Sequence, residues 1–394
     1  MDLILNAESL RPPLTGIGNY TFNILREMEC ASAIESIDCF DGRLWKGAVE
    51  QLSAVTSRPL SQGLSTLDRK GGVADDLKKL VRGIPGANRL RVAMLNRDIS
   101  RKLRSFSGAI YHEPNFILKD YDGPSVVTVH DLSFLHYPQY HPRERVAWLK
   151  RELRKSIGRA DFVITDSELV RTELMERFHL PENRTQAIYL GTDDTFYPRS
   201  LDQINGDIKV YGLHNKNYIL FVGTLEPRKG LGVLLDAWLL LPETMRRRFP
   251  IVIAGASGWK NTELLSRIKF LKETEGLRYL EYVPLDKLPA LYSAATICVN
   301  PSIYEGFGLP VLEAMACGTP VICGDGTSMA EFSAGACSLC EVSDSEDLSS
   351  SMEGLLNDDV LRNKFATKGL LRAADFSWQR CAKETIDVYG HIVG

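Results

Sequence analysis

Short apolar runs alternate with longer amphipathic runs along the whole 394-residue chain. Several of the apolar runs, such as Ser125–Val129 and Ile251–Ala254, contain mostly Val, Ile and other strand-favouring residues. Such runs are typical of strands buried on both faces of a parallel sheet. Runs such as Leu231–Leu241 and Val311–Cys317 fit the helices that connect parallel strands. The sequence therefore predicts an α/β fold in which this alternation occurs twice.

Ten strands are predicted, five in each half of the chain. In the first half they are Leu3–Asn6, Ala109–Tyr111, Ser125–Val129, Phe162–Thr165 and Ala187–Leu190. In the second half they are Tyr218–Val222, Ile251–Ala254, Tyr279–Val283, Thr296–Asn300 and Pro320–Cys323. The polar stretch Pro198–Asn217 separates the halves and is predicted to be a linker. Because the chain is too long for one compact core, we expect two domains with a boundary near residue 200, followed by a closing helical segment, Asp375–His391.

Composition places the chain among globular proteins, with 44% hydrophobic and 25% charged residues. The stretch Met1–Ala7 reads as a strand without a basic leader, and no run approaches the roughly 18 apolar residues of a membrane span. We therefore expect a cytoplasmic protein, either free or on the inner face of the membrane.

A turn with two adjacent cations, Arg228 and Lys229, follows the predicted strand Tyr218–Val222. Open α/β sheets bind ligands beyond the carboxyl ends of their strands, so this turn would face a cleft. Arg offers a planar fork and Lys a point charge for a diphosphate. These residues alone fit a diphosphate site and a pair of solvated surface cations equally well.

A glycine-rich turn with two glutamates, Glu305 and Glu313, follows the predicted strand Thr296–Asn300. Pro310 marks the first turn of a helix, whose N-terminus favours a phosphate. The glycines of the turn allow backbone N–H groups to approach a ligand closely. One carboxylate can then bond sugar hydroxyls and the other a ribose. The combination favours a nucleotide-sugar site over a turn with two solvated glutamates.

The stretch from Tyr304 to Val321, in which seven residues separate the two glutamates, resembles the retaining GT-B glycosyltransferases of family 4. The turn Gly223–Gly230 matches the diphosphate-binding turn of that family. Less specific similarities are found at Thr15–Tyr20, its first glycine-rich loop, at Val129–Phe134, at Thr165–Ser167 and at Phe376–Trp378, its crossover helix. The resemblance runs from about residue 1 to residue 394.

The resemblance implies two Rossmann-like domains that face a central cleft. Residues 1–200 would form the acceptor-side domain and residues 201–374 the nucleotide-sugar-binding domain, with residues 375–394 crossing back to the first. Arg228 and Lys229 would hold and neutralise the leaving diphosphate. Glu305 would contact the hydroxyls of the donor sugar, and Glu313 would bond the ribose.

Further substrate contacts are expected around these groups. His130 would lie near the reacting sugar, and we expect His112 to line the cleft. The remaining substrate-binding candidates are Gly16, Gly18, Gly223, Gly306, Phe307, Gly308 and Leu309. The family often has Leu-Pro-Glu where this chain has Ser328–Phe332, which leaves Glu331 as an open candidate for the matching acid.

No metal and no cofactor are expected. Asp120 and Asp122 form a D-x-D triplet, but it runs into Gly123-Pro124, which indicates a surface turn. Cys337 and Cys340 form a lone C-x-x-C without a second pair at zinc-ligand spacing. Because two cations are already available for the leaving group, the transfer needs no metal.

Two basic segments lie in the first half. Residues 69–104 hold eleven Lys or Arg against three Asp, and residues 143–159 hold seven against two Glu. They are either solvated helix faces or a surface for anionic lipid or a pyrophosphate-linked lipid acceptor. Nucleic acid is not an expected partner, because no recognised binding module accompanies the charge.

The expected activity is a retaining transfer of a sugar from a nucleotide sugar to a hydroxyl of a glycan or polyprenyl-diphosphate-linked acceptor. The run His130–Pro138 resembles bacterial mannosyltransferases that build O-antigen and capsule chains, which favours GDP-mannose or another GDP-sugar. A UDP-sugar-dependent enzyme and a non-catalytic sugar-nucleotide-binding protein remain alternatives. A dehydrogenase is disfavoured, because the loop Gly16–Thr21 lacks the third glycine of the dinucleotide fingerprint.

Overall fold

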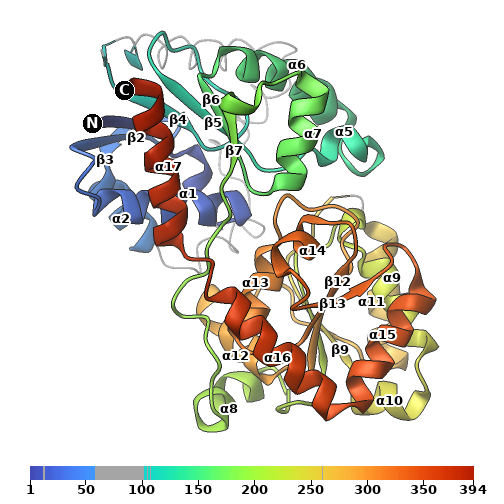
Figure 1. The fold of residues 1–394 in the computed structure, drawn as a ribbon. Helices are drawn as coiled ribbons and strands as arrows, with labels where there is room; N and C mark the ends of the chain where they lie inside the picture. The colour runs from blue at the N-terminus through green and yellow to red at the C-terminus, as the bar shows by residue number, and fades with distance from the viewer. Residues whose placement is uncertain (12–13, 58–101, 104, 107, 260) are drawn as a thin grey trace, which may run out of the picture.

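The computed structural model describes residues 1–11, 14–57, 102–103, 105–106, 108–259 and 261–394 (Figure 1). A seven-stranded sheet in the order β3-β2-β1-β4-β5-β6-β7 belongs to the first half of the chain, and a six-stranded sheet in the order β10-β9-β8-β11-β12-β13 to the second. All strand pairs are parallel except β2–β3, which is antiparallel. The predicted α/β fold with two largely parallel sheets is confirmed.

The strands are short and the helices run between them. The first sheet contains β1 (Asp2–Asn6), β2 (Ser36–Phe40), β3 (Trp45–Gly47), β4 (Ile110–Glu113), β5 (Ser125–Val129), β6 (Phe162–Thr165) and β7 (Thr185–Ala187). The second contains β8 (Ile219–Val222), β9 (Ile251–Ala254), β10 (Arg278–Tyr279), β11 (Ile297–Asn300), β12 (Val321–Gly324) and β13 (Ser338–Cys340). The described helices of the first half are α1 (Gly16–Glu29), α2 (Ala48–Thr56), α5 (Ser133–His136), α6 (Arg143–Arg159) and α7 (Glu168–Phe178). Those of the second half are α8 (Leu201–Val210), α9 (Leu231–Leu240), α10 (Glu243–Arg248), α11 (Thr262–Thr274), α12 (Leu288–Ala294), α13 (Leu309–Ala316), α14 (Ser328–Ser333), α15 (Ser345–Asn357), α16 (Asp359–Ala373) and α17 (Trp378–Val393).

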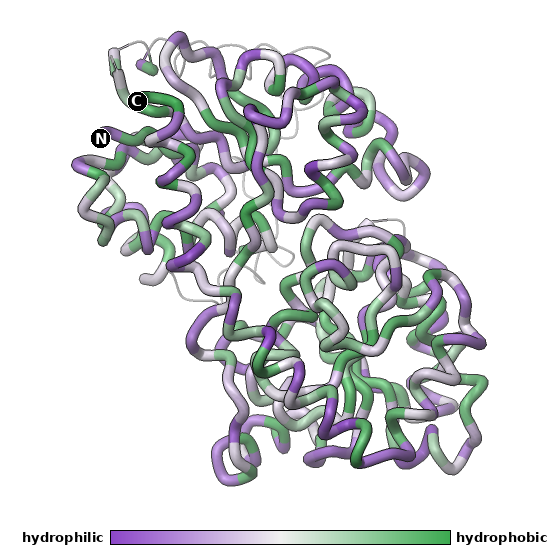
Figure 2. The backbone as a smooth tube through the Cα atoms, in the orientation of Figure 1, coloured by the Kyte–Doolittle hydropathy of each residue, from purple (hydrophilic) through white to green (hydrophobic). Residues whose placement is uncertain are grey.

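The central strands owe their stability to burial on both faces. Every residue of β5, β8, β9 and β11 is buried. Hydrophobic residues concentrate along these strands in Figure 2, whereas the outer helices carry hydrophilic ones. Fully burying one Val, Leu or Ile side chain contributes about 1.5–3 kcal/mol, so these strands anchor the two cores.

The last helix, α17, packs beside α1 in the first half, although it follows the second sheet in sequence (Figure 1). Its buried face includes Trp378, Cys381 and Tyr389. The hydroxyl of Tyr389 lies 2.6 Å from Nδ1 of His112 in β4. The chain end is therefore fastened to the centre of the first sheet.

The predicted linker Pro198–Asn217 is wrong in one respect, because α8 occupies its middle. The side chains of Ser200 and Gln203 form a capping box at the start of α8. Ile204 and Ile208, four residues apart, are buried against the core. A polar composition concealed a short amphipathic helix.

Three strands were missed and two were misplaced. The missed strands β2, β3 and β13 lie toward the ends of their sheets. The predicted strand Ala187–Leu190 overlaps β7 only at Ala187, and Tyr279–Val283 overlaps β10 only at Tyr279. The apolar residues of Ala187–Leu190 still reach the core, since Ile188 and Leu190 are buried. Ile188 and Leu190 are thus buried in the segment that follows β7 and not in a strand.

His112 does not line a cleft as expected. Its ring is completely buried, with Nδ1 near Tyr389 and Nε2 2.8 Å from Oγ1 of Thr128. Both nitrogens are thus occupied by protein groups, which gives His112 a structural role. Burial, with a smaller contribution from His130, lowers its pKa to about 3.

This pKa shift predicts a pH-dependent stability. An unfolded His takes up a proton near pH 6.5, whereas folded His112 does so only near pH 3. Its contribution is therefore complete above pH 6.5 and is lost as the pH falls toward 3, at about 1.4 kcal/mol per pH unit. In urea unfolding, the free energy of unfolding of His112→Gln should fall by about 2 kcal/mol less than that of wild type when the pH is lowered from 6.5 to 5. His214→Gln, an exposed histidine, is the control, and equal slopes for wild type and His112→Gln would refute the assignment.

Candidate active site

The two halves meet at the carboxyl ends of their sheets. A Cβ atom at Gly306, after β11, would overlap the carbonyl oxygen of His130, after β5. Only glycine allows this approach between the domains. The turn after β8, which includes the 3-10 helix Pro227–Lys229, lies at the same place, because the carbonyl oxygen of Arg228 accepts a 3.0 Å hydrogen bond from the N–H of Ile303.

The two predicted cations and Glu305 form one buried ion cluster. Nη1 of Arg228 lies 3.1 Å from Oε2 of Glu305, and Nζ of Lys229 pairs with Oε1 of the same carboxylate. Nε of Arg228 lies 3.1 Å from Oε2 of Glu226. Burial alone would raise the pKa of Glu305, but Lys229 and Arg228 outweigh it and lower the pKa. Glu305 is therefore a carboxylate that pairs with both cations, and Glu226 supplies a second negative charge beside Arg228.

Asp131 extends this charge balance to the first domain. Its Oδ1 accepts hydrogen bonds from N–H (2.9 Å) and Oγ–H (2.7 Å) of Ser133. Burial would raise its pKa, but Arg228 and these hydrogen bonds lower it. Burial opposes the charge of Arg228, yet Glu305, Asp131 and Glu226 raise its pKa. Carboxylates from both domains therefore surround the Arg228 guanidinium.

Glu313 lies on α13, the helix that the glycine-rich turn was predicted to start. Gly308 precedes the helix with a φ of 113°, and a Pro occupies its first turn. The Glu313 carboxyl accepts a 2.8 Å hydrogen bond from the hydroxyl of Tyr292. Burial raises its pKa to about 7. Near neutral pH this group is available both as a hydrogen-bond donor and as an acceptor.

The ring of His130 points into the first domain. Nδ1 lies 2.8 Å from Oδ2 of Asp166, and Nε2 lies 2.7 Å from the carbonyl oxygen of Pro114. Burial lowers the pKa of His130, but Asp166 raises it further, so the net shift is upward. Both ring nitrogens are engaged by protein groups, and the expectation that His130 lies near the reacting sugar stays a prediction. The carbonyl group of His130, beside Gly306, is the part at the junction.

The candidate glycines differ in their surroundings. Gly16 and Gly18 lie in the first turn of α1 and not in a loop, which corrects the expected loop. A Cβ at Gly18 would come within 2.8 Å of the carbonyl oxygen of Ser9, so packing requires this glycine. Gly223 continues the sheet through a 3.0 Å hydrogen bond from its N–H to the Ala254 carbonyl oxygen.

The other turn residues contribute mainly backbone. The ring of Phe307 is buried and stacks on Phe332 at 4.4 Å, which removes it from any ligand. A Cβ at Gly308 would lie 2.5 Å from Cγ of Met329. Leu309 begins α13 and is half-buried. The N–H groups of this turn remain the part suited to an anion.

His141 is a residue that sequence reasoning missed. Its ring is buried, and neither nitrogen has a hydrogen-bond partner within the described residues. The ring lies 5.9 Å from that of Trp259, which follows β9. Burial lowers its pKa, and Arg228 also lowers it, whereas Asp131 raises it. Its place beside the ion cluster comes from long-range packing, which a lone His-Pro pair does not reveal.

Glu331, the open candidate for the family acid, joins the two domains. Its carboxylate accepts hydrogen bonds from the N–H groups of Glu168 (2.9 Å) and Leu169 (2.8 Å), at the start of α7. It also accepts one from the hydroxyl of Tyr189 at 2.8 Å. A carboxylate at a helix N-terminus satisfies unpaired N–H groups and the helix dipole. Glu331 therefore caps a helix of the other domain.

Tyr304 makes a second polar connection between the domains. Its hydroxyl donates to Oε2 of Glu173 at 2.5 Å and accepts from the N–H of Leu132 at 3.2 Å. Tyr304 directly precedes Glu305, so the first domain contacts the segment that carries the central carboxylate.

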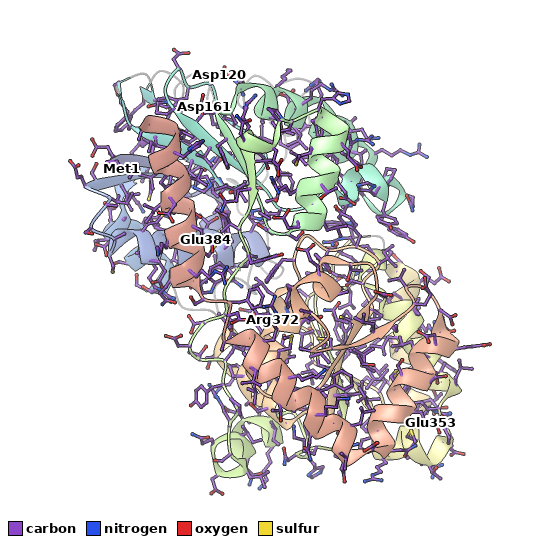
Figure 3. All side chains as sticks on the ribbon, in the orientation of Figure 1. Met1, Asp120, Asp161, Glu353, Arg372 and Glu384 are labelled. Carbon is purple, nitrogen blue, oxygen red and sulfur yellow. The ribbon has the colours of Figure 1, made fainter. Side chains whose placement is uncertain are left out.

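The D-x-D triplet lies away from the junction. Asp120 is exposed at the outer edge of the first domain, where it pairs with Arg159 (Figure 3). Within the part of the chain that the structure describes, no group of three or more His, Cys, Asp or Glu side chains is arranged to hold a metal. In the same residues, no helix is long and apolar enough to cross a bilayer.

Comparisons with known proteins match two family models to the chain. Residues 79–196 match the family described as Glycosyltransferase Family 4, and residues 205–372 match Glycosyl transferases group 1. The chain is 34% identical over 389 residues to the O-antigen chain mannosyltransferase B of Escherichia coli, covering 99% of each protein.

Solved structures share the fold over nearly the whole chain. A sucrose-phosphate synthase from Thermosynechococcus elongatus has a TM-score of 0.72 at 19% identity, covering 99% of this chain and 98% of that one. Anabaena HepE in complex with UDP and glucose has a TM-score of 0.71 at 16% identity, covering 99% of both. These similarities confirm the predicted GT-B fold.

The Glu331 contact predicts a change in domain arrangement. Glu331→Ala leaves the N–H groups of Glu168 and Leu169 without their carboxylate, which favours more open arrangements in which water satisfies them. Small-angle X-ray scattering of the ligand-free protein should therefore show a larger radius of gyration for Glu331→Ala. Glu353→Ala, an exposed residue at the far side of the second domain, should leave it unchanged (Figure 3). A radius of gyration equal to that of wild type for Glu331→Ala would show that the contact between Glu331 and α7 does not hold the domains together.

Proposed function

This chain belongs to glycosyltransferase family 4 and is a glycosyltransferase, and we propose that it transfers mannose from GDP-mannose with retention of the anomeric configuration. The acceptor is a hydroxyl of a glycan or polyprenyl-diphosphate-linked glycan in bacterial surface polysaccharide synthesis. The full-length similarity to an O-antigen chain mannosyltransferase supports the sugar and the pathway. The observation that carries the chemistry is the buried cluster of Arg228, Lys229 and Glu305 at the domain junction.

Donor binding begins by exchanging one anion for another. In the ligand-free protein Glu305 pairs with both Arg228 and Lys229. An incoming diphosphate takes over these cations as charge-assisted hydrogen-bond partners. The freed Glu305 carboxylate then accepts hydrogen bonds from hydroxyls of the sugar. Glu313, with its pKa near 7, binds the ribose hydroxyls.

The transfer breaks the bond between the anomeric carbon and the diphosphate oxygen, whose electron pair leaves with GDP. Arg228 and Lys229 stabilise the charge that develops on the leaving group. The acceptor oxygen attacks from the face that the diphosphate departs from, and its proton passes to a departing phosphate oxygen. Because Arg228 and Lys229 supply the positive charge, we propose that the reaction is independent of metal ions.

A UDP-sugar is the alternative donor, and nucleotide binding without turnover is the alternative function. HepE was solved with UDP and glucose, but its 16% identity supports only a shared fold. GDP is favoured because the full-length relative is named a mannosyltransferase and the segment His130–Pro138 resembles mannosyltransferases.

A donor screen tests this proposal. GDP-mannose should raise the thermal midpoint more than UDP-glucose or ADP-glucose, because a ligand that binds the folded state stabilises it by mass action. Transfer of radiolabelled mannose to a lipid-linked glycan should persist in excess EDTA. Arg228→Ala or Lys229→Ala should each cost about 2–4 kcal/mol of transition-state stabilisation, measured as kcat/KM. Near-normal turnover in both variants would remove these residues from the mechanism.

The same screen separates the two glutamates. Glu313→Ala should weaken calorimetric binding of free GDP. Glu305→Ala should not weaken it, because it removes the carboxylate that competes with the diphosphate for Arg228 and Lys229, but it should lower the transfer rate. The reverse pattern would exchange the two roles. Glu353→Ala, remote from the junction, is the control for both.

We also propose that α6 attaches the first domain to an anionic membrane surface. The exposed face of α6 carries Arg143, Arg145, Lys150, Arg151, Arg154 and Lys155, with Trp148 47% exposed among them. Of the other basic segment, residues 69–104, only Lys102 and Leu103 are described, and the remainder lies outside the described residues. Each Lys or Arg near an anionic leaflet contributes about 1 kcal/mol.

Vesicle sedimentation tests the membrane proposal. Replacing Lys150, Arg151 and Lys155 with Gln should weaken binding to phosphatidylglycerol vesicles at low salt by about 3 kcal/mol, and high salt should release the wild type. The matched control replaces Arg247, Lys269 and Lys272, three exposed cations of the second domain, with Gln. If the wild-type protein does not bind these vesicles at low salt, the proposed attachment of α6 to the membrane is refuted.

A further inference from the structure

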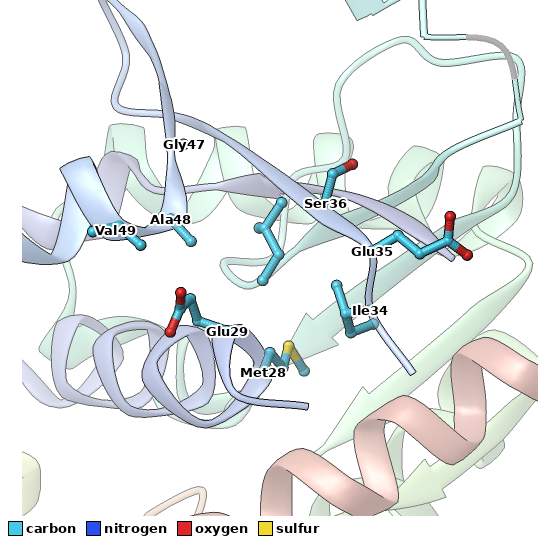
Figure 4. A pocket seen from close by; sticks show the side chains of 9 residues that line it. Met28, Glu29, Ile34, Glu35, Ser36, Gly47, Ala48 and Val49 are labelled. Atoms are coloured by element: carbon cyan, nitrogen blue, oxygen red, sulfur yellow. The ribbon is translucent and has the colours of Figure 1, made fainter. Parts of the chain in front are cut away.

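A polar cavity of about 260 Å³ lies beside the ends of β1 and β2 in the first domain. Its lining includes three cations, Arg11, Arg43 and Lys46, and one carboxylate, Asp41. A second cavity, of about 270 Å³, is lined by residues that include Glu29 and Glu35 and no Lys or Arg (Figure 4). The first cavity therefore has the charge of an anion site and the second does not.

Asp41 is largely engaged by the turn that it starts. Its Oδ1 accepts hydrogen bonds of 2.9 Å from the N–H groups of Arg43 and Leu44. Its Oδ2 lies 3.8 Å from Nζ of Lys46, which is also 3.9 Å from Glu50. The Arg43 guanidinium has no carboxylate partner in the described part of the chain. A positive excess remains at the cavity.

The Arg11 side chain is hydrogen-bonded to the backbone of the turn that begins at Asp41. Its Nη2 donates a 2.9 Å hydrogen bond to the carbonyl oxygen of Asp41. A Cβ at Gly42 would overlap Nη2 of Arg11, so glycine, with a φ of 86°, leaves room for the guanidinium. Glu8 lies close by but is paired with Lys119 at 3.2 Å. The remaining N–H groups of Arg11 can therefore serve a ligand.

Gln51 supplies an independent indication of a ligand. Its side chain lines the cavity and is only 4% exposed, yet its Oε1 has no hydrogen-bond partner within the described residues. A buried polar atom without a partner costs free energy until a ligand or water satisfies it. An amide can accept from a sugar hydroxyl or, turned over, donate to a phosphate oxygen.

The cavity lies at the carboxyl edge of the first sheet, the edge that faces the transfer site. Arg11 follows β1 and Arg43 follows β2, as His130 follows β5. The sheet order places β2 three strands from β5, and neighbouring strands lie about 4.8 Å apart, which gives about 14 Å. This separation is longer than one sugar ring.

We infer that the cavity binds the phosphate or diphosphate group of the acceptor, whose accepting hydroxyl lies on a sugar farther along the chain. The inference rests on the proposed function and assigns a substrate class to it. Arg11, Arg43 and Lys46 bind the anion, and Gln51 bonds the adjoining sugar or the phosphate. The position of the cavity thereby fixes the distance between the bound anion and the accepting hydroxyl.

Two acceptors that differ only in the anion test this inference. One is a dimannoside on phenoxyundecyl diphosphate, and the other is the same dimannoside as a neutral phenoxyundecyl glycoside. Arg11→Ala/Arg43→Ala and Gln51→Ala should raise KM for the diphosphate acceptor, at least tenfold in the double variant, and change kcat little. KM for the neutral acceptor should stay within twofold. Arg177→Ala, an exposed cation of α7, is the matched control.

The outcomes separate the site from the activity. If wild type uses both acceptors equally and the variants do not change KM for the diphosphate acceptor, the cavity assignment is overturned. If wild type uses neither, the proposed function fails, and calorimetry with inorganic pyrophosphate on GDP-saturated protein decides the cavity alone. Binding by wild type that the double variant loses supports the site, and equal binding or none overturns it.

A lipid headgroup is the other source of phosphate. If the double variant keeps wild-type KM for the diphosphate acceptor but loses binding to phosphatidylglycerol vesicles, the cavity serves a membrane lipid and the acceptor assignment is overturned. Thermal midpoints of all variants within 2 °C of wild type would show that folding is intact.

Discussion

The buried ion cluster at the domain junction constrains the rest of the molecule. Arg228 and Lys229 are 12% and 15% exposed, and buried charges are tolerated only when they are paired. Glu305 provides that pairing in the structure, and in the proposed mechanism the donor diphosphate takes its place. In the proposed mechanism, the carboxylate that pairs with these cations is therefore the one that donor binding releases toward the sugar.

The positions of site residues that depend on local sequence were predictable. The cation turn and the glycine-rich turn each follow a buried strand directly, and parallel strands bring their carboxyl ends to one edge. The histidines of the first domain depend on distant partners. His112 contacts Tyr389, 277 residues away, and His130 contacts Asp166, 36 residues away. No local pattern shows that these rings are already engaged.

The elements that were missed differ physically from those that were found. β2 contains both buried apolar residues and less buried polar ones, and β3 has only three residues. Neither therefore forms the continuous apolar run of a central strand. Gly16 and Gly18 matched a loop motif but lie in the first turn of α1. Of the two, only Gly18 is required by packing, because a Cβ there would meet the carbonyl oxygen of Ser9. The capping box of α8 is visible in the local sequence and could have predicted this helix. The contact of Glu331 with α7 depends instead on how the domains meet.

The domains meet at the site through polar contacts as well as aromatic ones, such as those of Tyr304 with His136 and of His141 with Trp259, and the polar contacts suit repeated opening. Glu331 at the start of α7 and Tyr304 between Leu132 and Glu173 can exchange their hydrogen-bond partners for water. Domain interfaces of this kind favour relative motion. Because Tyr304 is bonded to Glu305 in sequence, closure that seats its hydroxyl also fixes the backbone of the central carboxylate. In the proposed mechanism, excluding water and positioning Glu305 are therefore consequences of the same movement.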